Sequence, residues 1–200
     1  MHDSFSPKIK SLVDALKTLP GVGKKTSQRM AIQLLDKNRD GAEKLASSIV
    51  DALTSIKNCQ RCQVLTDTTY CSICSNNNRD DKQLCIVENM LDLVAIEESG
   101  GFKGKYFVLH GCISPLDGVG PADLKLPDLD NMVSKYEVEE VVMALSPSVE
   151  SETTIHFISD MLSKYSCKVS RIGFGIPFGG ELEYLDQQTI LHAFSAKTEF

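Results

Sequence analysis

Cys59-Gln-Arg-Cys62 and Cys71-Ser-Ile-Cys74 are two copies of a CxxC pattern, separated by eight residues in a chain of 200. The short turn inside each pair brings two sulfurs toward one metal ion, and two such pairs complete a tetrahedron of thiolates. The alternatives are two disulfides or four unrelated buried thiols, but disulfides need an oxidising compartment. The spacing therefore predicts one structural Zn²⁺ bound by Cys59, Cys62, Cys71 and Cys74, with a small hairpin in residues 63–70.

The composition is typical of a soluble cytoplasmic protein. The chain is 42% hydrophobic, which is enough for one large or two small domains with a core. Its first residues lack the apolar segment of a secretory signal, and no apolar run approaches the ~20 residues of a membrane span. The seven cysteines, an odd number, fit a reducing compartment.

The charge is divided unevenly along the chain. Residues 1–62 hold eleven Lys/Arg and six Asp/Glu, for a net charge of +5. Residues 63–200 hold ten Lys/Arg and twenty-one Asp/Glu, for −11, and the two parts together give the total of −6. A basic end joined to an acidic body suggests that only the N-terminal part contacts a polyanion.

The N-terminal part is predicted to be helical. Ser6-Pro7 is typical of a helix start, with Ser as N-cap and Pro in the first turn. Apolar residues then recur at helical spacing until Pro20-Gly21-Val22-Gly23, after which a second helical pattern begins. Asp40 and Glu43 resemble a capping box for a third helix. Its predicted buried stripe is Leu45, Ile49, Leu53 and Ile56.

After a polar segment at residues 75–82, the period changes. Short continuous apolar runs at residues 84–87, 106–109 and 141–145 suit strands that are buried on both faces. A fourth strand is expected near Lys168–Ile172, and helical patterns lie between the runs. This alternation predicts a small α/β domain with a parallel sheet.

Residues 173–200 differ from the α/β part. Five residues, Gly173, Gly175, Pro177, Gly179 and Gly180, predict a flexible or tightly turned loop. Asp186 is the expected N-cap of a final helix, which makes a terminal arm that could dock on its own domain or on another subunit.

The glycine turn between the first two helices has the form of a helix-hairpin-helix. Gly21 and Gly23 would let the backbone approach a phosphate, beside the positive end of the next helix. Lys24 adds a cation there, and Lys25 and Arg29, four residues apart, share one helix face. These residues predict sequence-independent DNA binding, with an ordinary αα turn as the alternative. A P-loop is excluded, because its first glycine would fall at Thr18.

Acidic residues near the strand ends raise the possibility of a Mg²⁺ site. Glu88 closes the first strand, Asp117 follows the second, and Glu150 and Glu152 lie beyond the third. The sequence favours solvated acids, a partner contact or a weak metal site over catalysis, because no closely paired aspartates are present. His110 and Cys112 could form a nucleophilic pair, but without an Asn or Asp partner a buried strand-end pair is favoured.

The order of these motifs resembles the RecR family of bacterial recombination mediators. The resemblance covers essentially the whole chain, and its segments are LPGVGKKTSQRMA, CxxC-x8-CxxC, LCIVE, YFVLHGCISPLDGVGP, SPSVESET and RIGFGIPFGGELEYLD. It implies four parts in an α+β chain: a helix-hairpin-helix region (1–57), a zinc finger (58–77), a Toprim α/β domain (78–172), and a Walker-B-like segment with a C-terminal helix (173–200).

The resemblance also implies a function. The family acts with RecO and RecF to load RecA onto single-strand gaps, and it forms ring-like tetramers that can encircle DNA. It places DNA contacts at Lys25 and Arg29, zinc at the four cysteines, and the Toprim acid at Glu88. A non-catalytic DNA clamp is therefore expected, with a Mg²⁺-dependent Toprim enzyme (nuclease, primase or topoisomerase) as the alternative.

The chain departs from the family pattern near the third strand. Ser146-Pro147-Ser148 stands where the family usually has NPT, and Val149-Glu150-Ser151-Glu152-Thr153 stands where it usually has VEGEA. Toprim enzymes carry a DxD after the third strand, where this chain has Ser146 and Ser148. Two hydroxyls cannot replace those negative charges, so the sequence favours the non-catalytic function.

Overall fold

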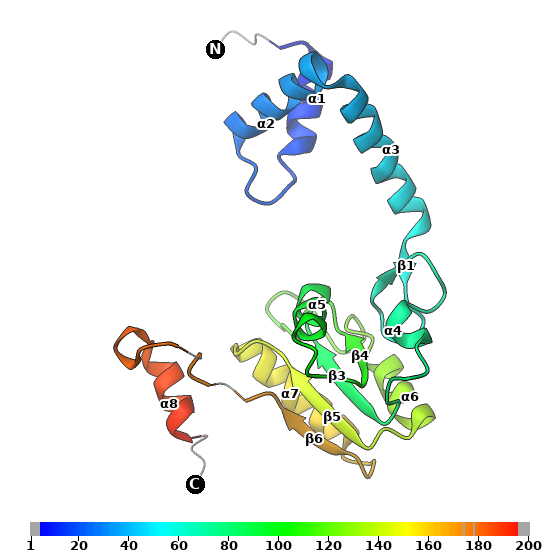
Figure 1. Cartoon of the computed structure of the whole chain (residues 1–200), viewed down its shortest axis with the longest axis vertical. Coiled ribbons are helices and arrows are strands. Elements are labelled where there is room, and N and C mark those ends of the chain that lie inside the picture. Colours follow the sequence, from blue (N-terminus) through cyan, green and yellow to red (C-terminus); the bar gives the residue numbers. More distant parts are fainter. Residues whose placement is uncertain (1–4, 174, 178, 196–200) are drawn as a thin grey trace. The chain divides into compact units, whose positions relative to one another are not determined.

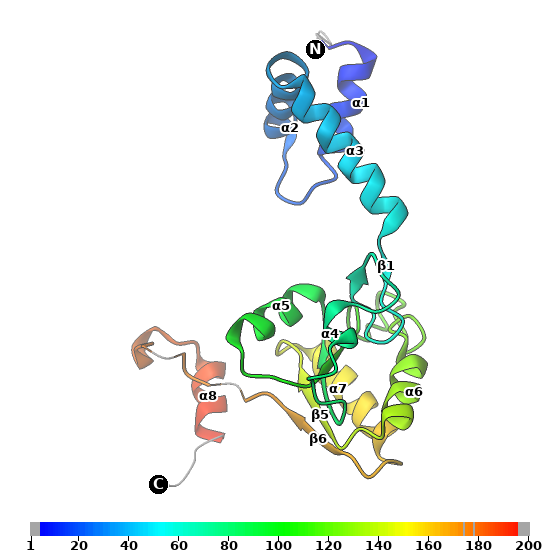
Figure 2. The same cartoon turned by 45° about the vertical axis from the view of Figure 1, so that its right-hand side comes forward.

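The computed structural model describes residues 5–173, 175–177 and 179–195, and the side chains of all these except Ser195. The chain divides into two compact units, Met1–Ile56 and Lys57–Phe200, which are called unit 1 and unit 2 below (Figures 1 and 2). No described helix combines the length and apolar character that crossing a bilayer requires.

Unit 1 consists of the helices that the apolar spacing predicted. They are α1 (Pro7–Leu16), α2 (Lys24–Ile32), a π-helical turn η1 (Gln33–Lys37) and α3 (Arg39–Ser55). Helix α1 begins at Pro7 as expected, although the Ser6 side chain makes no capping hydrogen bond. The capping box predicted at Asp40 is wrong. The π-helical turn ends at Lys37, so Asn38 is the residue before α3, and its side chain accepts from the Gly41 N–H at 3.1 Å.

The stripe predicted to be buried on α3 is exposed. Leu45, Ile49 and Leu53 are 47%, 51% and 79% exposed, because no other element of unit 1 covers this face of α3. Among the described residues of unit 1, only Val13, Ser27 and Ala31 are buried. Helical periodicity identified the apolar face correctly, but periodicity does not say what packs against it.

Unit 2 begins with a small ribbon that carries the cysteines. Strands β1 (Lys57–Asn58) and β2 (Leu65–Thr66) pair antiparallel, and α4 (Ser72–Ser75) follows. The hairpin therefore brackets the first CxxC pair, whereas the sequence placed it between the two pairs. Beyond the ribbon lie β3 (Gln83–Val87), β4 (Lys105–Val108), β5 (Glu140–Ala144) and β6 (Lys168–Arg171), at the predicted positions.

These four strands form a parallel sheet in the order β4-β3-β5-β6. Three helices complete the layers: α5 (Met90–Ser99), α6 (Leu126–Tyr136) and α7 (Val149–Leu162). One face of the sheet packs on α6 and α7, and the opposite face packs on α5 and the ribbon cysteines. Helix α5 was not singled out from the sequence, although its capping box of Asn89 and Asp92 is a sequence signal that could have found it.

The C-terminal segment contains a 3₁₀ turn, η2 (Leu182–Tyr184), and α8 (Gln187–Ser195). Asp186 caps α8 as predicted, since its Oδ1 accepts from the N–H groups of Gln188 and Thr189, both at 2.9 Å. Residues 174 and 178 of the predicted glycine-rich loop lie outside the described residues.

An ion pair fixes α5 to the loop that precedes β3. Arg79 donates to both carboxylate oxygens of Glu97 at 2.7 Å, and the Tyr106 hydroxyl donates to Glu97 Oε1 at 2.6 Å. The hydrogen bonds from Arg79 lower the pKa of Glu97. A lowered pKa in the folded state stabilises the protein above the pKa of the unfolded chain, and this stability is lost as the pH falls through the folded pKa.

We therefore expect Glu97→Gln to destabilise the protein at neutral pH, and the difference from wild type to shrink under acidic conditions. Urea unfolding followed by circular dichroism from neutral to acidic pH measures both effects. Glu98→Gln, at an exposed position on the same helix, is the control. A wild-type advantage over Glu97→Gln that stays constant across the acid range would contradict this assignment.

Candidate functional site

The four predicted ligand cysteines come together in one cluster. The sulfurs of Cys59, Cys62, Cys71 and Cys74 all lie within 4.8 Å of one another, and the Cys62–Cys71 Sγ distance is 3.5 Å. A tetrahedron with metal–sulfur bonds of about 2.3 Å has sulfur–sulfur edges of about 3.8 Å, so the cluster matches a four-thiolate site. All four cysteines carry free thiols, which excludes the disulfide alternative. A metal held by all four would have no open position for substrate.

The backbone of the ribbon holds the sulfurs in place. Each CxxC pair forms a tight turn, called a knuckle below: the first is Cys59–Cys62 and the second is Cys71–Cys74. The Cys59 N–H donates to the Val64 carbonyl at 2.7 Å and closes the first knuckle. Gln63 allows the chain to turn back there because it adopts a left-handed conformation (φ 66°). The Cys71 N–H donates to the sulfur of Cys59 at 3.4 Å, and the Cys74 N–H donates to the sulfur of Cys71 at the same distance. Amide donors directed at sulfur stabilise thiolates, so the ribbon is arranged for the metal-binding form of the cysteines.

A buried lysine ties the second knuckle to the sheet. The Lys105 side chain, on β4, is only 2% exposed. Its Nζ donates to the carbonyls of Ile73, Cys74 and Asn76 at 2.9, 3.2 and 2.8 Å. These are carbonyls at the end of α4, where a cation is favourable. The first knuckle is joined to the sheet by the Val108 N–H, which donates to the Cys62 carbonyl at 2.9 Å.

The electrostatics of the cluster favour a bound cation. Hydrogen bonds to Cys71 and Cys74 raise the pKa of Cys62 well above its usual value. Hydrogen bonding to Cys62 lowers the pKa of Cys71. Several thiolates cannot be charged together in a buried site without a positive ion, so a divalent cation would stabilise the charged form of the cluster.

Glu88 lies at the switch point of the sheet. It follows β3, and β3 and β5 are neighbours whose connections leave on opposite faces, which is where ligands bind in open α/β sheets. The Glu88 carboxylate interacts with the Cys112 thiol, whose Sγ lies 3.4 Å from Ser151 Oγ. Ser151 Oγ in turn accepts from Ser148 Oγ at 3.0 Å. The thiol beside Glu88 is thus linked to two hydroxyls.

The other acids do not complete a metal-binding group of three or more with Glu88 among the described residues. Glu152 is ion-paired to Arg171 at 2.6 Å, and Glu150 is exposed in the first turn of α7. Asp117 is exposed and accepts from Ser114 Oγ at 2.6 Å. Within residues 5–173, 175–177 and 179–195, only the cysteines form a group of three or more side chains placed for one metal.

His110 and Cys112 face different partners. His110 is exposed and its Nε2 lies 2.7 Å from the Gln63 carbonyl, whereas Cys112 contacts Ser151. The expectation of a buried pair is wrong for His110, whose positive φ of 60° turns the chain away from the strand. Burial raises the pKa of Cys112, so its thiol stays protonated and is a poor nucleophile.

The predicted helix-hairpin-helix turn is open to solvent. Gly21 has φ 77°, and the Val22 N–H donates to the Leu19 carbonyl at 3.1 Å, as in a type II turn with Pro20 at its second position. Nothing lies within 4 Å of where a Cβ of Gly21 or Gly23 would be. Helix α2 begins after Gly23 with no side-chain cap and no acidic residue in its first turn, so its N-terminal N–H groups are available to an anion.

The basic residues after the turn are exposed. Lys24, Lys25 and Arg29 all lie on α2. Lys25 and Arg29 line one shallow pocket of about 830 Å³ in unit 1, so the structure brings these two together as their spacing predicted, whereas Lys24 lies outside it.

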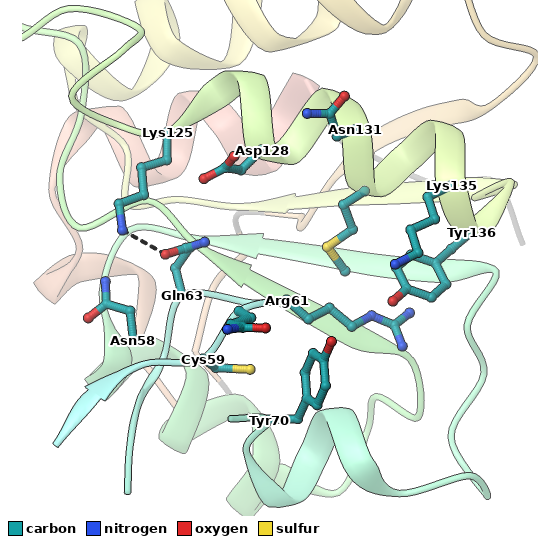
Figure 3. A pocket seen from close by; sticks show the side chains of 12 residues that line it. Asn58, Cys59, Arg61, Gln63, Tyr70, Lys125, Asp128, Asn131, Lys135 and Tyr136 are labelled. Carbon is teal, nitrogen blue, oxygen red and sulfur yellow. Dashed lines mark hydrogen bonds between the residues drawn. The ribbon is translucent and has the colours of Figure 1, made fainter. Parts of the chain in front are cut away.

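Sequence reasoning missed a second basic site in unit 2. A pocket of about 520 Å³ between the ribbon and α6 contains Arg61, Lys125 and Lys135 (Figure 3). Arg61 lies inside the first CxxC pair, more than sixty residues before Lys125 and Lys135, so no single motif contains the three cations. The position of Arg61 in that pair was the one sequence signal for this site.

Comparisons with known proteins agree with this architecture. A family model described as "RecR, helix-hairpin-helix" matches residues 9–53, one described as "Toprim domain" matches 82–173, and one described as "RecR, C-terminal" matches 175–198. The chain is 59% identical over 194 residues to "Recombination protein RecR" of Francisella tularensis subsp. novicida (strain U112). It is 58% identical to the protein of the same name from subsp. tularensis (strain WY96-3418).

Both alignments cover 97% of this chain and 96% of the relative. An identity this high over nearly the full length, with three family models matched in the same order along the chain, shows that the protein belongs to the RecR family.

Proposed function

We propose that this protein is a DNA-binding mediator of recombinational DNA repair that does not alter DNA covalently. The full-length similarity to proteins named "Recombination protein RecR" carries the proposal. By the same resemblance, it acts in the cytoplasm with RecO and RecF to load RecA on single-strand gaps. Its parts are those expected from the sequence, with DNA contacts at Gly21, Gly23, Lys24, Lys25 and Arg29.

The open turn and α2 support sequence-independent DNA binding. Exposed N–H groups at the start of α2 and two cations on one face suit phosphates, which carry no base information. The +5 charge of residues 1–62 attracts a polyanion, while the −11 charge of the remainder does not.

The surroundings of Glu88 support a non-catalytic Toprim domain. Phosphoryl transfer needs carboxylates that converge on Mg²⁺, whereas Glu88 interacts with the Cys112 thiol, and among the described residues no group of three or more acids is placed for one metal. Glu88, Glu150 and Glu152 therefore serve as a partner contact or a weak metal site. The alternative is a Mg²⁺-dependent enzyme, and incubation of labelled DNA with Mg²⁺ or Mn²⁺ distinguishes the two. Cleavage, relaxation or primer synthesis that disappears in Glu88→Gln would establish the alternative.

Zinc is the proposed metal, since four thiolates in a tetrahedral cluster select Zn²⁺. Apparent binding energies of structural zinc are on the order of 10 kcal/mol, comparable to the whole stability of a domain. We expect Cys71→Ser to lose the metal and to lower the melting temperature strongly. Acidification should release zinc as well, because thiolates must then take up protons.

Metal analysis of freshly purified protein, expected to give one zinc per chain, measures this directly. Cys167→Ser, at a half-buried cysteine outside the cluster, is the control and should retain the metal. Wild-type protein without zinc would refute the assignment.

Replacing Lys25 and Arg29 by Ala should weaken binding to all DNA sequences alike. Each lost phosphate contact should lower the slope of log affinity against log salt by about one. Fluorescence anisotropy on two unrelated duplexes over a salt series measures both quantities. Lys8→Ala/Lys17→Ala, which removes the same charge from α1 and the residue that follows it, is the control. Equal affinities for the double variant and wild type at every salt concentration would place the DNA site elsewhere.

The exposed apolar faces support self-association into the ring tetramer that the resemblance implies. Unit 1 buries few side chains, and α3 presents Leu45, Ile49 and Leu53 to solvent. On the C-terminal arm, Leu191 and Phe194 are also exposed. Single copies rarely leave such faces uncovered, so we expect both to be subunit contacts.

Light scattering tests this directly. Leu53→Glu should lower the fraction of protein in the oligomer, because it would bury a charge in the α3 contact. Deletion from Asp186 onward should change the number of subunits. Leu116→Glu, at a position that is 99% exposed in unit 2, is the control. An unchanged mass for both altered proteins would argue against these contacts.

A further inference from the structure

The pocket between the ribbon and α6 is built mainly of cations, amides and aromatic rings (Figure 3). The first knuckle and Tyr70 form one wall, and α6 with the residue before it forms the other. Because both walls belong to unit 2, the shape of the pocket is set within that unit. Its volume of about 520 Å³ lies in the range of pockets that hold small organic ligands.

Arg61 is buried in this pocket with unused donors. Its side chain is 7% exposed, and its guanidinium lies over the Tyr136 ring, 3.6 Å from the ring centroid. Nη2 is 2.9 Å from Asp81 Oδ1, so the charge is paired. Even so, neither Nε nor Nη2 has a hydrogen-bond acceptor among the described residues, because these N–H bonds are not directed at that oxygen. Nε and Nη2 are themselves buried, so what Arg61 contributes to the pocket is the positive charge of its guanidinium in the wall.

The charge of the pocket is opposite to that of the chain around it. It contains Arg61, Lys125 and Lys135 against Asp128, whereas residues 63–200 carry a net charge of −11. Lys125 precedes α6 and Lys135 lies in its last turn, ten residues further on, which is a distance of about 15 Å along a helix. One small anion cannot contact both, so the spacing favours a ligand with several negative charges in a row.

The side chains between the two lysines suit flat, polar groups. Lys125 Nζ donates to Gln63 Oε1 at 2.8 Å, which fixes the orientation of that amide (Figure 3). Further amides come from Asn58, Gln60 and Asn131. The Tyr70 ring is 45% exposed and can stack on a base. Amides paired with an exposed ring recognise bases, while the two lysines recognise phosphates.

We propose that this pocket binds a short segment of single-stranded DNA, with phosphates at Lys125 and at Lys135 with Arg61, and a base on Tyr70. The choice of DNA over an acidic peptide rests on the proposed function and on the amides and aromatic ring. Since the first knuckle forms one wall, the metal centre shapes the pocket. The ribbon is thereby part of a binding site as well as a structural element.

The test measures binding of fluorescently labelled octadeoxythymidylate by anisotropy. The pocket variant is Tyr70→Ala/Lys135→Met, whose two side chains are exposed and whose loss should leave the fold intact. We expect its affinity for the oligonucleotide to fall about tenfold. The slope of log affinity against log salt should fall by about 0.7, for one phosphate contact on a single strand. Circular dichroism and zinc content should match wild type.

The control variant is Leu116→Ala/Lys168→Met, which removes one exposed side chain and one charge elsewhere in unit 2. It should bind the oligonucleotide as wild type does. Ultraviolet cross-linking to an oligonucleotide that contains 5-iododeoxyuridine should label Tyr70. Unchanged affinity in the pocket variant, or cross-links confined to unit 1, would overturn the proposal.

Two further arms separate this inference from the proposed function. Lys25→Ala/Arg29→Ala should keep the Tyr70 cross-link while losing duplex binding. Duplex binding that survives in this variant, together with the Tyr70 cross-link, would overturn the helix-hairpin-helix assignment and support the pocket. Duplex binding by wild type with no Tyr70 cross-link would overturn the pocket alone. Displacement of the oligonucleotide by an octaglutamate peptide at lower concentration than by unlabelled oligonucleotide would show that the ligand is an acidic protein segment.

Discussion

The buried cluster of four thiols is the constraint on which unit 2 depends. Its sulfurs lie within 4.8 Å of one another beneath the sheet, where their charges cannot coexist without a cation. Lys105 and the Val108 N–H join the two knuckles to β4. The knuckles that hold the sulfurs therefore also cover one face of the sheet. The cysteines share a core with Val87 and Tyr106, which makes the ribbon part of the α/β fold.

Much of this architecture could be predicted because its signals are local. CxxC spacing identified the cluster, and continuous apolar runs identified β3, β4 and β5, whose burial follows from the layers around them. The turn at Gly21 was evident because proline followed by glycine specifies its conformation. The cap at Asp186 is also a local signal, because an Asp directly before a helical apolar pattern is a common N-cap.

The features that were missed depend on tertiary structure. The cap of α3 is Asn38 because a π-helical turn determines where that helix begins, and the sequence carries no clear signal for such a turn. The pocket at Arg61 forms only when α6 approaches the ribbon, across more than sixty residues of chain. The net charge of the sequence did not reveal this pocket, because the sequence around Lys125 and Lys135 is acidic overall.

The uncovered face of α3 has a consequence for how unit 1 persists. A helical unit with three buried residues among those described has little hydrophobic free energy of its own. If a second copy covers Leu45, Ile49 and Leu53, the folded state of this unit is linked by mass action to the amount of protein present. Dilution would then loosen α1–α3 before it affects the sheet. The cell's expression level of the protein would itself set how much of the turn at Gly21 is properly formed.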